Sequence, residues 1–224
     1  MADRPKIAIL ASGSGTTAES VIHATQSGVL NADVCLVISN NENAGIFDRI
    51  KRLNIEYDLN IQTLHINGAT HPGGAGNSGE QTLDESAAIN QAAIKSSADL
   101  ILLLGYMKKV RGDLLQQYGG LANHASIYQA RMLNTHPGPL PESAAQFGRG
   151  VQQIILDTHL GYSAQTLHVV TDEYDMGKTV AVHRVPVINS DTADTLFDSV
   201  QLTEKAYLPV DVETFLNEQA SFRA

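Results

Sequence analysis

The sequence of 224 residues has a single cysteine, no long apolar run and no cluster of basic residues. The lone Cys35 excludes an intramolecular disulfide and a cysteine-based zinc site. The longest purely apolar runs, such as residues 100–104, are too short to cross a bilayer, and the first ten residues lack the apolar stretch of a signal peptide. The net charge of −9, with no Lys/Arg block, argues against a nucleic-acid surface. We therefore expect a cytoplasmic protein that binds small molecules rather than membranes or nucleic acids.

The remaining composition is that of an ordinary globular protein, with 43% hydrophobic and 17% charged residues. A chain of this length can bury roughly 70% of the surface that it exposes when unfolded, so it needs no disulfide or structural metal to stabilise it. We expect one domain over residues 1–224, with its core between residues 6 and 216.

Apolar runs typical of buried strands alternate with segments of helical periodicity. The predicted strands cover residues 6–11, 32–38, 62–66, 99–104, 131–135, 164–170 and 179–187. The predicted helices cover residues 18–27, 44–53, 84–97, 151–160 and 192–217, with a break at Pro209. Gly28 follows the first of these helices as its predicted C-cap. This alternation predicts an α/β, Rossmann-like fold with a mainly parallel central sheet flanked by helices, and an antiparallel pair in the C-terminal half. Residues 67–79 are rich in Gly and Asn and predict a flexible loop, in which His71 is interpreted as a solvated residue.

A glycine turn follows the first predicted strand. Residues 13–18 match the pattern G-x-G-x-x-A, in which glycines allow close approach of a ligand and the following helix offers free N–H groups to an anion. A dinucleotide site would also require an acidic residue at the end of the second strand, to bind the ribose hydroxyls. This chain has Ser39, Asn40 and Asn41 there. The turn therefore favours a single phosphate over NAD, although a purely structural turn remains an alternative.

Asn134 and His136 stand two residues apart in an extended segment, so their side chains lie on the same side of it. Three prolines follow at positions 137, 139 and 141 and stiffen the exit from the strand. A polar pair at the end of a strand is typical of a site in an α/β sheet. A structural histidine beside an Asn turn explains the pattern equally well.

Three carboxylates follow the strand at residues 164–170. Asp172 and Glu173 are interpreted as part of a solvated turn. Asp175 is followed closely by Gly177 and is placed to turn inward. A carboxylate near His136 would raise the pKa of that imidazole and favour its charged form.

These three motifs, in this order and at these separations, resemble the folate-dependent formyltransferase family from Lys6 to about Leu216. The most specific matches are N-x-H-P-x-x-L-P at residues 134–141 and T-D-E-x-D-x-G at residues 171–177. The resemblance implies transfer of a formyl group from 10-formyltetrahydrofolate to the amine of glycinamide ribonucleotide in purine biosynthesis. It implies no metal, small-molecule partners only, and a monomer or homodimer.

The resemblance also implies roles for individual residues. Asn134, His136 and Asp175 match the catalytic trio, with Asn134 and a protonated His136 donating hydrogen bonds to the oxyanion. The residues matching the substrate site are Gly15, Thr16 and Thr17 at the phosphate and Gln201 and Glu204 at the glycinamide. The residues matching the folate site are Met107, Lys108, Lys109, Val110, Asn134, Thr171, Asp172, Glu173 and Tyr174. His168 is interpreted as structural or supporting.

The chain also departs from the family pattern. Thr16 and Thr17 replace the usual Ser-Asn, Glu80 and Gln81 stand where an arginine is usual, and residues 142–148 lack a usual lysine. These changes remove two cations near anion sites and leave the amine acceptor open. One alternative is a formyltransferase of the same fold acting on another amine, such as an aminosugar nucleotide. Another is a nucleotide-binding oxidoreductase that uses residues 13–18.

Overall fold

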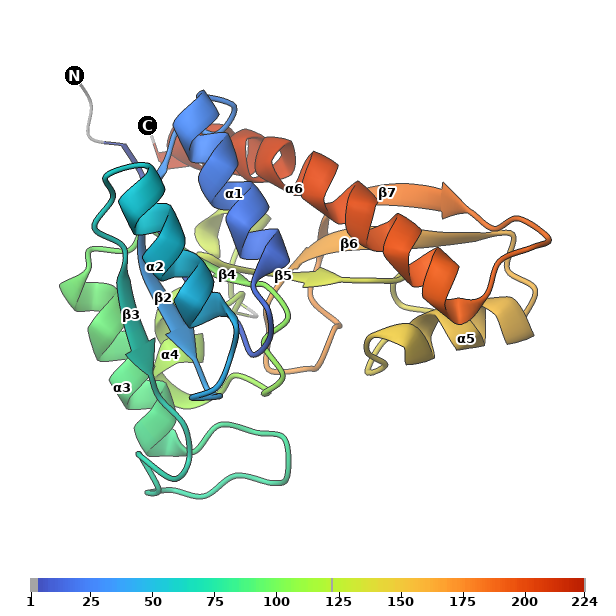
Figure 1. Ribbon diagram of the computed structural model, residues 1–224. Helices are drawn as coiled ribbons and strands as arrows, with labels where there is room; N and C mark the ends of the chain where they lie inside the picture. The colour runs from blue at the N-terminus through green and yellow to red at the C-terminus, as the bar shows by residue number, and fades with distance from the viewer. Residues whose placement is uncertain (1–3, 122, 224) are drawn as a thin grey trace.

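The computed structural model describes residues 4–121 and 123–223. One sheet with the strand order β3-β2-β1-β4-β5-β6-β7 runs through the domain (Figure 1). The strands are β1 (Lys6–Leu10), β2 (Asp33–Ser39), β3 (Gln62–His65), β4 (Leu100–Leu103), β5 (Met132–His136), β6 (Tyr162–Val169) and β7 (Thr179–Pro186). The helices are α1 (Thr16–Ser27), α2 (Ile46–Glu56), α3 (Leu83–Lys95), α4 (Gly112–Tyr118), the 3-10 turn η1 (Ile127–Gln129), α5 (Arg149–Asp157) and α6 (Ala193–Arg223).

The sheet changes direction at β5. Strands β3, β2, β1, β4 and β5 pair parallel, whereas β6 pairs antiparallel with both β5 and β7. The predicted α/β fold with a mainly parallel sheet, and the predicted antiparallel pair in the C-terminal half, are therefore confirmed. Parallel neighbours place their carboxyl ends at one edge of the sheet, where ligands gather in α/β folds.

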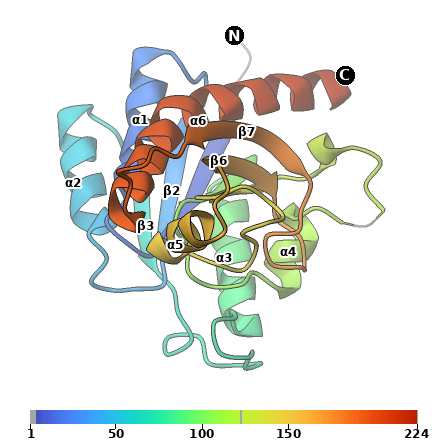
Figure 2. The ribbon, with the colours of Figure 1, turned by 90° about the vertical axis from the view of Figure 1, so that its right-hand side faces the viewer.

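Helices cover both faces of the central strands, which is why β1 and β4 read as continuous apolar runs. Along β1, Ile7 and Ile9 pack on one face with residues of α1, α2 and α6, and Ala8 and Leu10 pack on the other face with residues of α3 and α4. The view along the sheet in Figure 2 shows α1 and α6 on one side and α3 and α4 on the other. This alternation is the period of two expected for a strand that is buried on both sides.

One prediction about the helices is wrong, and one helix was not predicted. Helix α6 continues through Pro209, which is buried inside it, although a break was expected there. Leu208, Val212 and Phe215 keep helical spacing on both sides of this proline and are fully or almost fully buried against the sheet, so packing outweighs the lost backbone hydrogen bond. The short helix α4 was not predicted, because only two of its seven side chains, Leu114 and Tyr118, are buried and set its register.

Two helix ends show local capping signals, and one of these was predicted. Gly28 ends α1 in the left-handed conformation, as predicted for a helix C-cap. Thr82 and Glu85 form a reciprocal capping box at the start of α3, directly after the glycine-rich loop at residues 67–79. Among the described residues, none of the helices is both long and apolar enough to cross a membrane.

Candidate active site

Strand β5 brings Asn134 and His136 to one wall of a cleft, and two further groups meet them there. Asn134 Nδ2 donates a hydrogen bond to His168 Nε2 on β6 at 3.0 Å and lies 3.5 Å from Asp175 Oδ1. His136 Nδ1 lies 3.5 Å from Asp175 Oδ2. The three residues of the predicted trio therefore converge, although 41 positions separate Asn134 from Asp175. His168 orients the Asn134 amide, in agreement with its interpretation as a supporting residue.

The backbone turns Asp175 inward. Asp175 has a positive φ of 56°, a conformation that non-glycine residues adopt rarely and that occurs often at functional sites. Two residues later, a Cβ on Gly177 would lie 1.7 Å from the carbonyl oxygen of Val169, so only glycine allows the chain to return this closely to β6. The Ala145 N–H donates to Asp175 Oδ2 at 3.1 Å and fixes the carboxyl group.

The pKa of His136 is shifted downward, which corrects one prediction. Burial, together with the nearby His168, lowers the pKa of His136 from 6.5 to about 4. Burial also raises the pKa of Asp175, and the hydrogen bond from Ala145 acts in the opposite direction. The pKa of His136 is therefore lowered, whereas the sequence predicted that Asp175 would raise it.

Ser143 fixes which nitrogen of His136 carries the proton. The Ser143 hydroxyl donates to the Pro139 carbonyl at 2.7 Å, so its oxygen accepts a hydrogen bond from His136 Nε2 at 2.9 Å. We therefore assign the hydrogen to Nε2 and an accepting lone pair to Nδ1, which faces Asp175. Sequence reasoning missed Ser143, because it belongs to the segment at residues 142–148 that departs from the family pattern.

A cavity of about 270 Å³ lies beside Asn134, His136 and Asp175. It is lined by the glycine turn, the ends of β4 and β5, residues 146–148 and one side of α6. The predicted substrate residues Gly15, Thr16, Thr17, Gln201 and Glu204 all line it, as do Met107 and Tyr174. The structure thus places the predicted substrate residues and the predicted trio around one space.

The glycine turn leads into this cavity. Gly15 is the N-cap of α1 with a φ of 75°, and no side chain caps the helix, so its first N–H groups face the turn. A Cβ on Gly15 would lie 2.6 Å from Ile46 Cγ1, so the residue also permits close packing of α2. The nearby Arg49 donates to the Ser14 carbonyl and pairs with Glu19. Among the described residues, no Lys or Arg lines the cavity.

Glu204 connects α6 with the turn and the sheet. Thr17 Oγ1 donates to Glu204 Oε2 at 3.0 Å, and Thr135 on β5 forms a second side-chain hydrogen bond with the same carboxyl. Burial raises the pKa of Glu204, and these two hydrogen bonds act in the opposite direction. The carboxyl group therefore stands between the predicted phosphate turn and the strand that carries His136.

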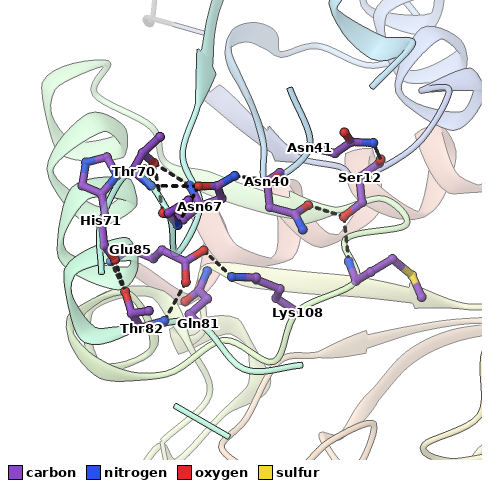
Figure 3. Close-up of polar contacts among 12 residues, drawn as sticks. Ser12, Asn40, Asn41, Asn67, Thr70, His71, Gln81, Thr82, Glu85 and Lys108 are labelled. Atoms are coloured by element: carbon purple, nitrogen blue, oxygen red, sulfur yellow. Dashed lines mark hydrogen bonds and ion pairs between the residues drawn. The ribbon is translucent and has the colours of Figure 1, made fainter. Parts of the chain in front are cut away.

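Hydrogen bonds fix the loop after β4, which carries the predicted folate residues. The Met107 N–H donates to Ser12 Oγ at 2.9 Å, and Ser12 Oγ donates to Asn40 Oδ1 at 2.5 Å. Lys108 Nζ lies 2.6 Å from Oε1 of the buried Glu85, at the capping box of α3 (Figure 3). The loop is therefore anchored both to the glycine turn and to α3.

A second, narrow cleft of about 30 Å³ adjoins the trio. Lys108, Lys109, Val110, Thr171, Glu173 and Tyr174 line it together with Asn134 and His168. Its volume is about that of one water molecule, far below that of a pterin. Asp172 does not line this cleft, but lines a separate cavity together with Thr171 and Glu173. Thr171 and Glu173 therefore line both spaces, whereas Asp172 faces the separate cavity.

Comparisons with known proteins identify relatives of this chain. A family model described as formyl transferase matches residues 5–212. The chain is 25% identical over 206 residues to the trifunctional purine biosynthetic protein adenosine-3 of Bos taurus, covering 92% of this chain but only 18% of that protein. It is 27% identical over 210 residues to the phosphoribosylglycinamide formyltransferase of Haemophilus influenzae, covering 94% of this chain and 86% of that enzyme.

Solved structures show the same fold. The crystal structure of phosphoribosylglycinamide formyltransferase from Bacillus halodurans has a TM-score of 0.78 and 26% sequence identity, and the match covers 94% of this chain and 95% of that chain. The resemblance inferred from the motifs at residues 134–141 and 171–177 is confirmed, because the matching family model spans nearly the whole sequence. The chain belongs to the formyl transferase family.

Proposed function

We propose that this chain transfers the formyl group of 10-formyltetrahydrofolate to the primary amine of glycinamide ribonucleotide. The observation that carries the proposal is the convergence of Asn134, His136 and Asp175 on one cavity that also reaches the glycine turn. A phosphorylated amine placed in this cavity has an anion site at one end and a proton acceptor at the other. The names of the relatives from Haemophilus influenzae and Bacillus halodurans support this choice of acceptor.

The reaction needs an oxyanion donor and a base. The amine nitrogen attacks the formyl carbon, forming a C–N bond and a tetrahedral oxyanion, and collapse then breaks the bond between that carbon and N10 of the folate. Asn134 Nδ2 has a long contact of 3.5 Å with Asp175, so this N–H is available to the oxyanion. The amine nitrogen loses a proton in the exchange, and N10 of the departing folate gains one.

His136 accepts the proton of the amine in this proposal. Its Nδ1 carries a lone pair, because Nε2–H is bonded to Ser143, and a pKa of about 4 leaves it unprotonated at neutral pH. Asp175 lies 3.5 Å from Nδ1 and stabilises the imidazolium while it exists. The proton then passes to N10, which restores the neutral imidazole for the next cycle.

The two substrates enter from different sides in this scheme. The phosphate of the acceptor binds at Gly15, Thr16 and Thr17, and Gln201 and Glu204 contact the rest of the acceptor. The pterin binds between Met107–Val110 and Thr171–Tyr174, which requires the second segment to move outward from the narrow cleft. We further propose that residues 1–224 act as one formyltransferase domain.

An acceptor screen tests the proposed function. The wild-type protein is incubated with 10-formyltetrahydrofolate and either glycinamide ribonucleotide, an aminosugar nucleotide or no amine, and release of tetrahydrofolate is followed spectroscopically. Turnover that depends on glycinamide ribonucleotide supports the proposal. Turnover with the aminosugar nucleotide alone, or equal turnover without any amine, contradicts the proposed acceptor.

A further inference from the structure

Gln165 on β6 is a buried amide without a partner at the wall of the large cavity. Its exposed fraction is 1%, and among the described residues neither its Nε2 nor its Oε1 has a hydrogen-bond partner. The side chain lines the cavity of about 270 Å³ that also contains His136 and Glu204. A buried amide without hydrogen-bond partners lowers the stability of the folded protein, so native proteins retain few of them.

The other buried glutamines of the C-terminal half, Gln152 and Gln219, form side-chain hydrogen bonds. Gln152 donates to the Pro137 carbonyl and accepts from the Ser163 hydroxyl. Gln219 donates to the carbonyl oxygens of Tyr128 and Ala130 at 3.0 and 2.9 Å. Of these three buried glutamines, Gln165 is therefore the one whose amide lacks hydrogen-bond partners, and it is also the one that lines the cavity.

The sheet register places Gln165 on the acceptor side of the cavity. His136 pairs with Thr166, and Thr135 pairs with Leu167, so Gln165 shares its face with Thr135 and not with His136. Thr135 forms a hydrogen bond with Glu204, which in turn accepts from Thr17 at the glycine turn. Gln165 thus lies on the side of the cavity where Glu204 connects the glycine turn with β5. It does not share the face of the sheet that carries His136, the proposed proton acceptor.

We propose that Gln165 is a specificity-determining residue that binds the sugar hydroxyls of the acceptor. Its amide offers one donor and one acceptor side by side, which matches two neighbouring hydroxyl groups on a ring. In the proposed function, on which this inference rests, the acceptor carries its phosphate at the glycine turn and its amine near His136, so its pentose lies between them beside Gln165 and Glu204. A site built to bond hydroxyl groups discriminates strongly against molecules that lack them.

The substitution Gln165→Met tests this inference, because methionine has nearly the same shape and no amide. Binding of glycinamide ribonucleotide and of 10-formyltetrahydrofolate is measured separately by calorimetry, and the Tm is measured without ligands. We expect the Kd for glycinamide ribonucleotide to rise about 10-fold and the Kd for the folate to stay unchanged. We expect the Tm to rise by about 2–4 °C, since the unpartnered amide is removed.

Gln152→Met is the matched control, because it removes an amide that is fully bonded, and its Tm should fall. An unchanged Kd for glycinamide ribonucleotide in Gln165→Met, or equal weakening of both ligands, overturns the inference. A Tm of Gln165→Met that falls like that of Gln152→Met also overturns it, because the amide would then have partners within the free protein. If wild-type protein does not bind glycinamide ribonucleotide at all, the proposed function fails together with the inference.

Discussion

Strands β4 and β6 lie two positions apart in the same sheet and are both buried, but they bury different side chains. β4 has the sequence LILL and packs aliphatic groups on both faces. β6 has the sequence YSAQTLHV and buries Ser163, Gln165, Thr166 and His168. Burying a polar group is costly unless it is hydrogen-bonded, so β6 depends on particular partners in a way that β4 does not.

The partners that these residues have come from other elements of the C-terminal half. Ser163 donates to Gln152 on α5. Thr166 donates to the Gly138 carbonyl after β5 at 2.8 Å, and His168 accepts a hydrogen bond from Asn134 on β5. The parallel half therefore supplies a stable apolar frame, and the antiparallel half positions the polar groups of the site. The comparison predicts that substitutions in β4 lower stability, whereas substitutions on the polar side of β5 and β6 lower activity.

Among the substitutions that test this comparison, Asn134→Ala has the largest expected effect on activity. Replacing Asn134 with Ala removes the oxyanion donor, and loss of one such donor typically lowers kcat by about 10²–10³-fold. Steady-state formyl-transfer rates at saturating folate and amine measure the effect. A kcat within a few-fold of the wild-type value would remove Asn134 from the mechanism and weaken the contrast between the two halves.

A matched substitution in the apolar strand β4 should lower the stability of the protein without lowering its activity. Leu102 is fully buried in β4, between Ile9 and Leu133 on its neighbouring strands. Leu102→Ala leaves a cavity and should lower the free energy of unfolding by about 2–5 kcal/mol. Urea denaturation measures this loss, and kcat per folded molecule should remain near the wild-type value. A large fall in kcat at unchanged stability would show that the two halves are not separable in this way.

A smaller effect concerns the pH dependence of stability. Burial holds the pKa of His136 near 4 in the folded protein, below 6.5, so the unfolded chain binds more protons between these values. Stability that is present above pH 6.5 is therefore lost as the pH falls toward 4. His168 acts in the same direction, and Asp175, whose pKa is raised, acts against it.

The variant His136→Asn isolates the contribution of His136 to this loss. Its free energy of unfolding should decrease less between pH 6.5 and 4 than that of the wild-type protein, as measured by urea titrations at several pH values. Equal slopes for the two proteins would mean that His136 has an ordinary pKa in the folded state.

The apolar half could be predicted from the sequence because its strands follow local rules. The runs at residues 6–11 and 99–104 predict β1 and β4 from hydrophobicity alone, and Gly28 predicts the end of α1. Pro209 was misinterpreted because local propensity disfavours a helix there, whereas packing of Val212 and Phe215 against the sheet decides the outcome.

The site was only partly predictable, for a physical reason. Motifs identified Asn134, His136 and Asp175, but the protonation state of His136 depends on burial, which the sequence does not state. The roles of Ser143 and Gln165 depend on the side chains that the fold places around them. Ser143 orients His136, and Gln165 lacks the hydrogen-bond partners that a buried amide requires. The narrowness of the cleft beside Tyr174 likewise results from how two distant segments pack.

The most direct test of the account is formyl transfer by His136→Ala, compared with wild-type protein at equal concentrations of folded molecules. If His136 accepts the amine proton, the rate with 10-formyltetrahydrofolate and glycinamide ribonucleotide falls by about 10²–10⁴-fold, and circular dichroism shows that the fold is retained. A folded His136→Ala protein that transfers formyl groups at the wild-type rate would contradict the assignment of His136 as the base.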